Sequence, residues 1–386
     1  MMNFEILADN PNGTIIKVIG VGGAGGNAVN HMIRSGVKGV DFICANTDAQ
    51  ALAITEAPIQ IRLGRSGLGA GAKPDQGRAC AETAREDIRN ALNGANMVFI
   101  TAGMGGGTGT GASPIVAEIA KELGILTVGV VTKPFAFEGN RRMRMAEEGI
   151  KELSKHVHSL IVVLNEKLYD LLDEDATQED CFKSADSILN NACAGIAEII
   201  NVEGNVNVDF EDVRTIMGEK GQAMMGTATA EGVDRARIAA EDAIACPLLE
   251  GVDLHGAKGI LVNITSGKSL KMRETREIME TIRSYAAEDA TIIFGNAYDD
   301  TMGDKLRVTV VATGLGKNLD NKNSNIIDKN IKNSKENVIN TNNEQKSDNQ
   351  VLNKNLRNQA SSQIKALEDS GVDHFDIPSF LRKQVD

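Results

Sequence analysis

Aromatic side chains are scarce in this chain of 386 residues, which has 10 Phe, three Tyr and no Trp. A surface that stacks the bases of a nucleic acid depends on such rings, so their scarcity weighs against that class of function. The cores must instead be built mainly from Ile, Val, Leu, Met and Ala. The chain is long enough for two domains, and a hydrophobic content of 42% is sufficient for a core in each.

Cysteines and long apolar runs are also few. The five cysteines form no C-x-x-C pair and have no histidine at the spacing of a metal site; they are Cys44, Cys80, Cys181, Cys193 and Cys246. An odd number without a signal peptide does not suit a disulfide framework, so we expect buried thiols in a reducing cytoplasm. No apolar run approaches the roughly 18 residues of a membrane span, so a role at a membrane would depend on a partner.

Basic residues are fewer than acidic ones, 41 Lys and Arg against 53 Asp and Glu, so the formal net charge is −12. Residues 317–370 carry nine Lys and Arg against seven Asp and Glu, a balance of +2, and residues 371–386 carry −1, which leaves −13 on residues 1–316. A body of this charge should repel DNA and anionic lipid. It does not exclude a nucleotide site, because backbone N–H groups can supply positive potential where lysine is absent.

Glycine, by contrast, is concentrated in two runs that each follow an apolar segment. Gly103–Gly111 lies between the apolar run Met97–Ile100 and a helical pattern over Ser113–Leu123. Gly20–Asn27 follows a strand-like run over Ile15–Ile19. Dense glycine lets backbone N–H groups approach an anion closely, and the helix that follows adds its N-terminal dipole. Each run therefore predicts a cradle for phosphate.

The run Gly20–Asn27 on its own leaves two interpretations open. It fits G-x-G-x-x-G, the fingerprint of a Rossmann dinucleotide fold, and Asp41 or Asp48 lies near the distance expected of a ribose-binding acid. A dinucleotide enzyme needs one such turn, whereas two cradles after successive strands favour a shared grip on one nucleotide. The chain lacks G-x-x-x-x-G-K-[ST], which disfavours an ordinary P-loop triphosphatase.

Strand-like and helix-like segments alternate in the first third of the chain. They cover residues 15–19, 27–35, 39–45, 77–90, 97–102, 113–123 and 126–132. Such alternation predicts a three-layer α/β domain with a parallel sheet, whose ligand lies at the carboxyl ends of the strands.

The remaining two thirds divide into three parts. A single long helix is predicted over 178–202, about 35 Å in length and able to touch two domains. A smaller α+β domain is predicted from segments over 259–264, 272–287, 291–296 and 306–313. Beyond Gly316, 14 Asn among residues 317–370 predict a disordered linker.

The segment Gly105–Gly111 resembles the signature of the tubulin and FtsZ superfamily, and the chain as a whole resembles the bacterial FtsZ branch more than eukaryotic tubulin. The resemblance covers roughly residues 14–316 and the last dozen. Its further motifs are residues 22–27, 46–48, 132–135, 137–139, 207–210, 212 and 376–383. Ala24 departs from the glycine run, which costs little if its φ is negative.

The resemblance implies a division of the chain into seven segments. They are a flexible leader over 1–13, a GTP-binding domain over 14–177, the central helix over 178–202, a catalytic loop with the following helix over 203–221, a C-terminal α+β domain over 222–316, the disordered linker over 317–370 and a partner-binding peptide over 371–386.

The resemblance also implies the residues that bind GTP or GDP. Glu138 and Arg142 match positions near the ribose, Phe182 matches the base-stacking position and Asp186 matches the acid that pairs with guanine. The other implied nucleotide-binding residues are Gly22, Gly23, Ala24, Gly25, Gly26, Asn27, Gly105, Gly106, Gly107, Thr108, Gly109, Thr110 and Asn165.

Two interpretations apply to the acids after the central helix. Asp209 and Asp212 are spaced as the N-cap and N3 of a helix, which resembles a capping box without any catalytic role. By the resemblance, they polarise the attacking water in the next subunit's site and help hold Mg²⁺, with Asn207 alongside. Hydrolysis would then require polymerisation, and a head-to-tail contact that does not close gives a filament.

The resemblance thus implies a cytoplasmic GTPase whose filaments form the ring at the midcell division site. Residues 375–383 would bind division adaptors, so contact with the membrane is indirect, and no nucleic acid is involved. Two other functions stay open: a Rossmann-type oxidoreductase, which lacks a convincing catalytic His, Lys or Tyr, and a structural filament that binds nucleotide without hydrolysing it.

Overall fold

The computed structural model describes residues 13–169, 172, 176–201, 206, 208–219, 221–245 and 256–315. Ten strands in this part of the chain form one sheet, in the order β3-β2-β1-β4-β5-β6-β7-β10-β8-β9. Neighbours from β3 to β7 are parallel, β10 is antiparallel to β7 and β8, and β9 is parallel to β8. The pairing of β6 with β7 therefore joins the two sheets that the sequence predicted separately.

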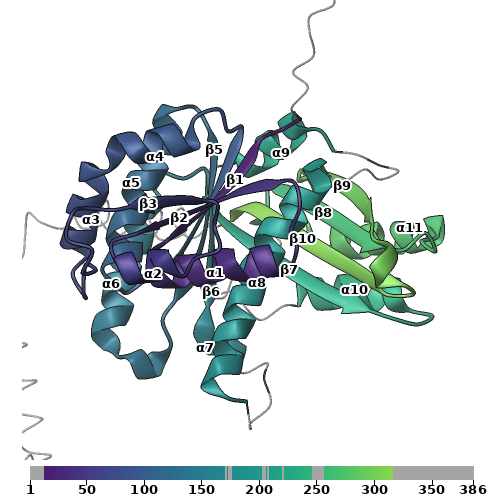
Figure 1. The fold of residues 1–386 in the computed structure, drawn as a ribbon. Coiled ribbons are helices and arrows are strands. Elements are labelled where there is room, and N and C mark those ends of the chain that lie inside the picture. The colour runs from purple at the N-terminus through teal and green to yellow at the C-terminus, as the bar shows by residue number, and fades with distance from the viewer. Residues whose placement is uncertain are drawn as a thin grey trace, which may run out of the picture. The chain divides into compact units, whose positions relative to one another are not determined.

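The elements fall into two groups along the chain (Figure 1). The first group is β1 (Ile16–Val21), α1 (Gly22–Arg34), β2 (Val40–Asn46), α2 (Ala49–Ala53), β3 (Ile59–Arg62), α3 (Pro74–Thr83), α4 (Arg85–Leu92), β4 (Met97–Gly103), α5 (Thr108–Glu122), β5 (Leu126–Lys133), η1 (Ala136–Glu138), α6 (Asn140–Leu153), β6 (Ser159–Leu164) and α7 (Asn165–Tyr169). The second is α8 (Gln178–Asn201), α9 (Phe210–Met217), β7 (Gly221–Ala230), α10 (Arg235–Ile244), β8 (Gly259–Ser266), α11 (Met272–Tyr285), β9 (Thr291–Tyr298), η3 (Asp300–Met302) and β10 (Leu306–Leu315).

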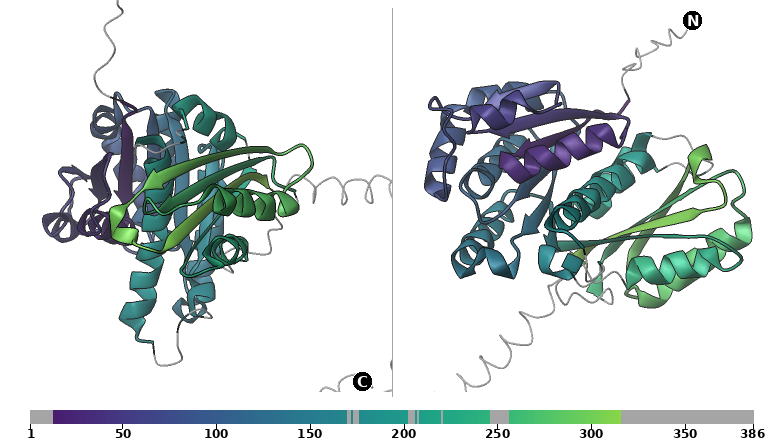
Figure 2. Two further views of the ribbon diagram at one scale, coloured as in Figure 1. Left: turned by 90° about the vertical axis from the view of Figure 1, so that its right-hand side faces the viewer. Right: turned by 60° about the horizontal axis from the view of Figure 1, so that its bottom comes forward.

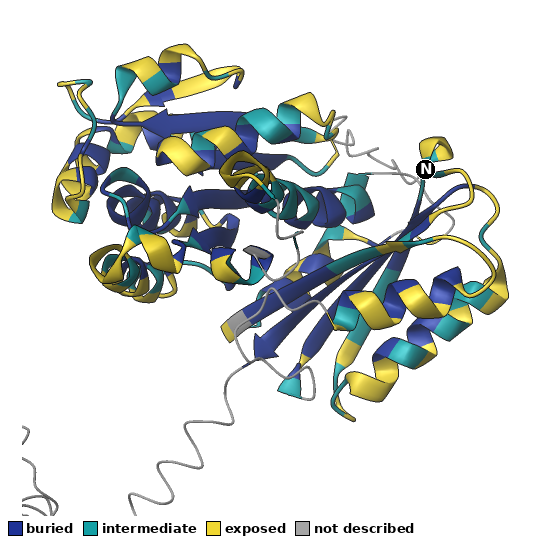
Figure 3. Cartoon of the chain, turned by 90° about the horizontal axis from the view of Figure 1, so that it is seen from below, coloured by how far each residue is buried: buried dark blue, intermediate teal, exposed yellow. Residues whose placement is uncertain are grey.

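The N-terminal half has the three layers predicted from its sequence. Successive residues of a strand point to opposite faces, so Ile16 and Val18 of β1 join a core with α1 and α8, whereas Ile19 and Val21 join a core with α3 to α6. Figure 3 shows these strands buried and the outer faces of the helices exposed. Apolar β-branched residues on both faces are typical of a parallel sheet covered on both sides.

Helix α8 covers Gln178–Asn201 of the central helix predicted over 178–202, and residue 202 lies outside the described residues. Its buried Leu189 and Ile196 share one core with Leu261 of β8 and Val311 of β10. The same core contains residues of α1 and of the N-terminal strands. Figure 2 shows α8 between the N-terminal layers and the C-terminal strands. Because both neighbours bury the helix, its direction and position are fixed.

The C-terminal strands have their other face covered by α10 and α11 (Figure 1). Ala240 of α10 and Ile278 and Ile282 of α11 pack there against Val262 of β8 and Val308 of β10. This part of the chain is the α+β domain predicted from the sequence.

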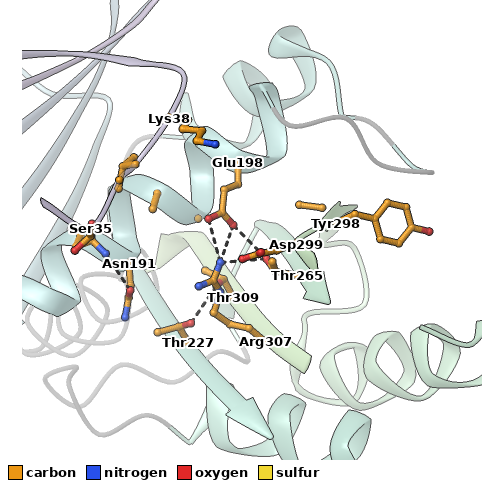
Figure 4. A pocket seen from close by; sticks show the side chains of 16 residues that line it. Ser35, Lys38, Asn191, Glu198, Thr227, Thr265, Tyr298, Asp299, Arg307 and Thr309 are labelled. Atoms are coloured by element: carbon orange, nitrogen blue, oxygen red, sulfur yellow. Dashed lines mark hydrogen bonds and ion pairs between the residues drawn. The ribbon is translucent and has the colours of Figure 1, made fainter. Parts of the chain in front are cut away.

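A cavity of about 360 Å³ lies between α8, the loop after α1 and the C-terminal strands. Arg307 of β10 donates to both carboxylate oxygens of Glu198 on α8, at 2.9 and 3.0 Å (Figure 4). Thr265 of β8 donates to the same carboxylate at 3.2 Å. These contacts tie the central helix to the C-terminal domain. The lining of this cavity includes none of the site residues proposed from the sequence.

Three predicted helices differ in their bounds. Both glycine cradles include the first turn of a helix, because α1 begins at Gly22 and α5 at Thr108. The helix predicted over 77–90 is two helices that meet at Ala84, with φ −103° and ψ 16°. At this break the Thr83 hydroxyl donates to the Cys80 carbonyl at 2.8 Å. Such a local hydrogen bond competes with continuation of the helix.

Two expectations from composition can be compared with the described residues. The thiols of Cys44, Cys80, Cys181 and Cys193 are buried and form no disulfide, as predicted, whereas Cys246 lies outside the described residues. In the same part of the chain, no helix has the length and apolar character needed to cross a membrane.

A buried ion pair holds the C-terminal domain together. The Arg235 guanidinium, whose side chain is 6% exposed, donates to both oxygens of Glu274, at 2.7 and 3.0 Å. It also donates to the Asp304 carbonyl at 2.6 Å and to Ser269 at 3.3 Å. The arginine thus joins α10, the start of α11 and two loops. The pKa of Glu274 is lowered, chiefly by its hydrogen bond from Arg235.

Glu274→Ala should lower the free energy of unfolding of the C-terminal domain by about 3–5 kcal/mol, because it leaves the arginine charge buried without its partner. Glu280→Ala, at an exposed position of the same helix, is the matched control and should change it by less than about 0.5 kcal/mol. Urea unfolding followed by circular dichroism measures both. A loss below about 1 kcal/mol for Glu274→Ala would show that the pair is not required for stability.

Candidate functional site

The two glycine runs meet at one edge of the sheet. Strands β1 and β4 are adjacent and parallel, and Val21 lies opposite Ala102 in their register. The runs therefore leave the sheet side by side. A Cβ placed on Gly22 would lie 3.0 Å from the Gly109 nitrogen, and one on Gly103 would lie 2.6 Å from the Cβ of Ala24. This contact between the two runs leaves no room for larger side chains at these positions.

Backbone conformation explains several of the glycines. Gly22 has φ +77° and Gly105 has φ +98°, values that side chains other than glycine rarely tolerate. A Cβ on Gly107 would approach the Gly71 carbonyl oxygen to 2.2 Å. No residue other than glycine has positive φ in the described ranges. The φ of Ala24 is therefore not positive, so alanine in place of glycine costs little at this position.

The space in front of the cradles is open and bordered by backbone donors. A Cβ on Gly23 or on Gly106 would meet no atom within 4 Å. In neither α1 nor α5 does the N-cap side chain accept a hydrogen bond from the first N–H groups, and neither helix has an acid in its first turn. The first N–H groups of both helices therefore remain available, and their dipoles favour an anion at this place.

The two threonines of the second cradle have different environments. The Thr110 hydroxyl is buried and accepts a hydrogen bond from the Gly105 N–H at 2.9 Å, which holds the loop closed. The Thr108 hydroxyl lies 2.7 Å from that of Thr47, at the end of β2. Thr108 is half-buried. Asn27, in the first cradle, is exposed.

Glu138 and Arg142 lie together and next to the second cradle. Their side chains form an ion pair of 2.6 Å, and the other oxygen of Glu138 accepts from the Phe135 N–H at 2.9 Å. A Cβ on Gly105 would lie 2.8 Å from the Arg142 carbonyl oxygen. Arg142 is half exposed beside the open space, so its guanidinium can reach a ligand there.

Aromatic rings connect this loop to α8. The Phe182 ring meets that of Phe135 edge to face at 5.4 Å between centroids, and Phe135 stacks on Phe137 at 5.1 Å. Asp186 follows Phe182 by one helical turn, so both face the same side of α8. These contacts connect the residues predicted to bind the base with the pair predicted to lie near the ribose.

Two polar groups in this region lose water at a cost: Asp186 is half-buried and Asn165 is buried. Burial raises the pKa of Asp186 to about 6, and the described residues provide it with no hydrogen-bond or ion-pair partner. Asn165 is 5% exposed, and its Oδ1 has no hydrogen-bond partner in the part of the chain that the structure describes. It begins α7, which packs on α8 through Leu168 and Ala185. Buried polar groups without a partner are uncommon in folded proteins, and a ligand that supplies the missing partner is one explanation for them.

The acids after α8 are not brought to the cradles. Asn201, the last residue of α8, donates to the Gly39 carbonyl at 2.6 Å, and Gly39 immediately precedes β2. The Met217 carbonyl, at the end of α9, accepts from Ser159, the first residue of β6. The acids of α9 therefore lie at the amino ends of the N-terminal strands, and Figures 1 and 2 show α9 near the start of β1. The cradles lie at the opposite edge.

Asp209 is the N-cap of α9, as one of the two interpretations predicted. Its Oδ1 accepts from the Asp212 N–H at 2.8 Å. The reciprocal bond of a full capping box is not found among the described residues. Asp209 and Asp212 are both exposed, so a carboxylate oxygen of each remains available to another molecule. Asn207 lies outside the described residues.

Asp186→Asn should raise the free energy of unfolding at pH 7 by about 1–2 kcal/mol, because it removes a partly screened charge from a buried position. The folded pKa lies above that of the unfolded chain, so wild-type stability falls as pH rises from about 4 through 6. The gain should therefore vanish near pH 4. Asp180→Asn should instead destabilise, since hydrogen bonds from Thr177 lower the pKa of that acid. Urea unfolding at several pH values tests this, and equal stability of Asp186→Asn and wild type throughout would contradict it.

Comparisons with known proteins agree with this geometry. Residues 15–173 match the model of the Tubulin/FtsZ family, GTPase domain, and residues 221–316 match that of the FtsZ family, C-terminal domain. The chain is 51% identical over 381 residues to "Cell division protein FtsZ" of Buchnera aphidicola, covering 97% of this chain and 98% of the relative. The protein of the same description from Pseudomonas aeruginosa is 50% identical over 393 residues, covering 99% of this chain and 100% of that protein.

Solved structures are similar as well. A structure of FtsZ from M. jannaschii superposes with a TM-score of 0.75 and 41% identity, covering 78% of this chain and 88% of the other. These likenesses do not favour the dinucleotide oxidoreductase that one glycine run alone left open. The chain belongs to the tubulin/FtsZ family, and its N-terminal half is the GTPase domain of that family.

Proposed function

We propose that this chain hydrolyses GTP and polymerises head to tail into filaments that act in bacterial cell division, with each active site assembled from two subunits. The observation that carries the proposal is the separation within one chain between the glycine cradles and the acids of α9. Relatives about 50% identical over nearly the whole chain are described as cell division proteins. A structure of the M. jannaschii relative is titled as a dimer.

The nucleotide would lie along the connected contacts of the site. Its phosphates would bind the N–H groups of the two cradles and the Thr108 hydroxyl, and its ribose would lie near Glu138 and Arg142. Phe182 would stack on the base. The Asp186 carboxylate would accept from the N1–H and amino groups of guanine. The Asn165 Oδ1, which has no partner among the described residues, would accept a hydrogen bond from the nucleotide. Adenine has an acceptor at N1, so an acid at this place selects against it.

Magnesium would be held chiefly by the phosphates and water. No group of three or more His, Cys, Asp or Glu side chains able to hold a metal occurs in the described part of the chain. Mg²⁺ commonly binds through substrate phosphates with only one or two carboxylates, so this donor set suits it. Asp48, next to Thr47, is a candidate ligand, because only its Oδ1 is occupied in capping α2. The ion would neutralise charge that develops on the phosphates.

The acids beside the cradles have other partners. Asp48 caps α2, and Glu138 binds both the Phe135 N–H and Arg142. Both oxygens of Glu138 are therefore occupied, and the remaining oxygen of Asp48 is the one assigned above to the magnesium ion. Asp209 and Asp212 are exposed at the opposite edge of the sheet. A second copy stacked head to tail would bring them to the γ-phosphate, where they would position the water, with Asn207 near them.

Exposed apolar side chains flank the cradles, as a subunit interface requires. Leu68 is 89% exposed and lies opposite Asp48 in an isolated bridge, and Phe137 is 71% exposed beside Phe135. Val206, close to Asp209 in sequence, is 39% exposed. Large apolar side chains exposed at two opposite edges suit a contact between unlike faces, which propagates into an open filament.

The C-terminal peptide would connect the filament to its partners. Residues 375–383 lie outside the described residues, and the support for this role is their sequence, which places apolar residues after a long Asn-rich segment. A short peptide of this kind can bind in the groove of a division adaptor. Membrane contact would then be indirect, and the filament would be located at midcell in the cytoplasm.

Phosphate release per molecule should depend on protein concentration if two subunits form each site. With GTP and Mg²⁺, we expect release per molecule to be low below a threshold concentration and to rise together with light scattering above it. The two signals are recorded in one cuvette across a dilution series. Release per molecule that stays constant through the onset of scattering would contradict a shared site.

Asp212→Ala should bind GTP within about twofold of wild type and assemble, yet hydrolyse it about 100-fold more slowly, a loss typical for one positioning group. The matched control is Glu211→Ala, an adjacent exposed acid that pairs with Arg214 at 3.1 Å. It should keep turnover within a few fold. Equilibrium GTP binding and phosphate release measure the two quantities, and full turnover by Asp212→Ala would overturn the assignment.

A further inference from the structure

One contact at the site comes from a third loop, outside both glycine runs. The hydroxyl oxygens of Thr47 and Thr108 are 2.7 Å apart, the usual distance for an O–H···O hydrogen bond. Thr47 follows β2 and Thr108 begins α5, so the contact joins the segment after β2 to the second cradle. The role proposed for the cradles does not account for Thr47.

The burial of the two hydroxyls differs. Thr47 is 1% exposed, whereas Thr108 is half-buried beside the open space in front of the cradles. A buried hydroxyl must place its proton on an acceptor. Among the described residues, the acceptor in contact with the Thr47 hydroxyl is Thr108 Oγ1. The distance alone allows either oxygen to donate. Because the buried Thr47 hydroxyl has no other acceptor among the described residues, we assign the proton to Thr47 and the acceptor role to Thr108.

This direction decides what Thr108 can do. Each hydroxyl has one proton and two lone pairs. If Thr108 donated to Thr47, it would have no proton left for a phosphate oxygen, which can only accept. With Thr47 as the donor, the Thr108 proton is left for a ligand in the open space. We propose that Thr47 is a positioning residue, which holds the Thr108 hydroxyl as a hydrogen-bond donor to the phosphates of the bound nucleotide.

The backbone around Thr47 is held firmly enough for this role. The Thr47 carbonyl accepts from the Gly69 N–H at 3.1 Å, and the Asp48 N–H donates to Asn46 Oδ1 at 3.2 Å. Asp48 then caps α2 through two backbone N–H groups. The β-branched side chain of Thr47 has few rotamers, so a fixed backbone also fixes its hydroxyl. The donor is in place before a nucleotide binds.

The inference rests on the proposed function, because it requires Thr108 to bind phosphate. The two are separated by a double-mutant cycle of Thr47→Val and Thr108→Val, which are close in shape to threonine and lack its hydroxyl. Affinities for GTP and GDP are measured at equilibrium with the full chain below the assembly threshold. Thermal unfolding without nucleotide is followed for each variant, and Thr47→Ser restores the hydroxyl.

We expect Thr108→Val to weaken GTP affinity about 10- to 30-fold and Thr47→Val about 5- to 10-fold, with Thr47→Ser within twofold of wild type. The double variant should be no weaker than Thr108→Val, because Thr47 acts only through Thr108. Above the assembly threshold, Thr47→Val should also lower turnover at saturating GTP.

Three outcomes would overturn parts of the account. If Thr108→Val leaves affinity unchanged, the assignment of this hydroxyl to the phosphates fails, and the inference fails with it. If Thr108→Val weakens binding but Thr47→Val does not, or if their effects multiply, Thr47 does not act through Thr108. If Thr47→Val lowers the unfolding temperature while affinity stays at the wild-type value, its hydroxyl has a structural role only.

Discussion

The rigidity and burial of one helix determine how this protein can work. Helix α8 contains 24 residues, about 36 Å of regular helix, and is packed on both sides in a single core. Its first turns carry the residues proposed to bind the base, and its last residue contacts the loop before β2. The acids of α9 cannot approach the cradles of their own chain while this helix is intact. A second subunit is the simplest source of the missing groups.

The phosphate site is built almost entirely from backbone, which explains how an acidic chain can bind a polyanion. The cradles offer N–H groups at two helix N-termini without competing side-chain caps. Polar side chains at the site carry a cost in the free chain: Asp186 is partly deprived of water, and an oxygen of Asn165 has no partner. Hydrogen bonds from guanine would offset both costs. These residues would thus lower the stability of the free chain and favour the binding of guanine.

Features with strong local patterns could be predicted from the sequence, and long-range contacts could not. Two dense glycine runs after apolar strands located the cradles, and the apolar stripe of α8 located the central helix over all of its described residues. Strand β7 and helix α10, rich in Ala, Met and Gly, have little periodicity and were not predicted. The contacts of Thr47 with Thr108 and of Phe182 with Phe135 join residues 61 and 47 positions apart, which no local pattern records.

If a cradle in one subunit works with acids from the next, two variants that are defective alone should restore activity when they are mixed. Asp212→Ala keeps the nucleotide site and lacks the acid, whereas Asp186→Asn keeps the acid and should bind GTP poorly. The measurement is phosphate release from each variant alone and from their equimolar mixture above the assembly threshold. The account predicts that the mixture releases phosphate much faster than the sum of the separate variants. A mixture that releases no more than that sum would show that Asp212 acts within its own subunit.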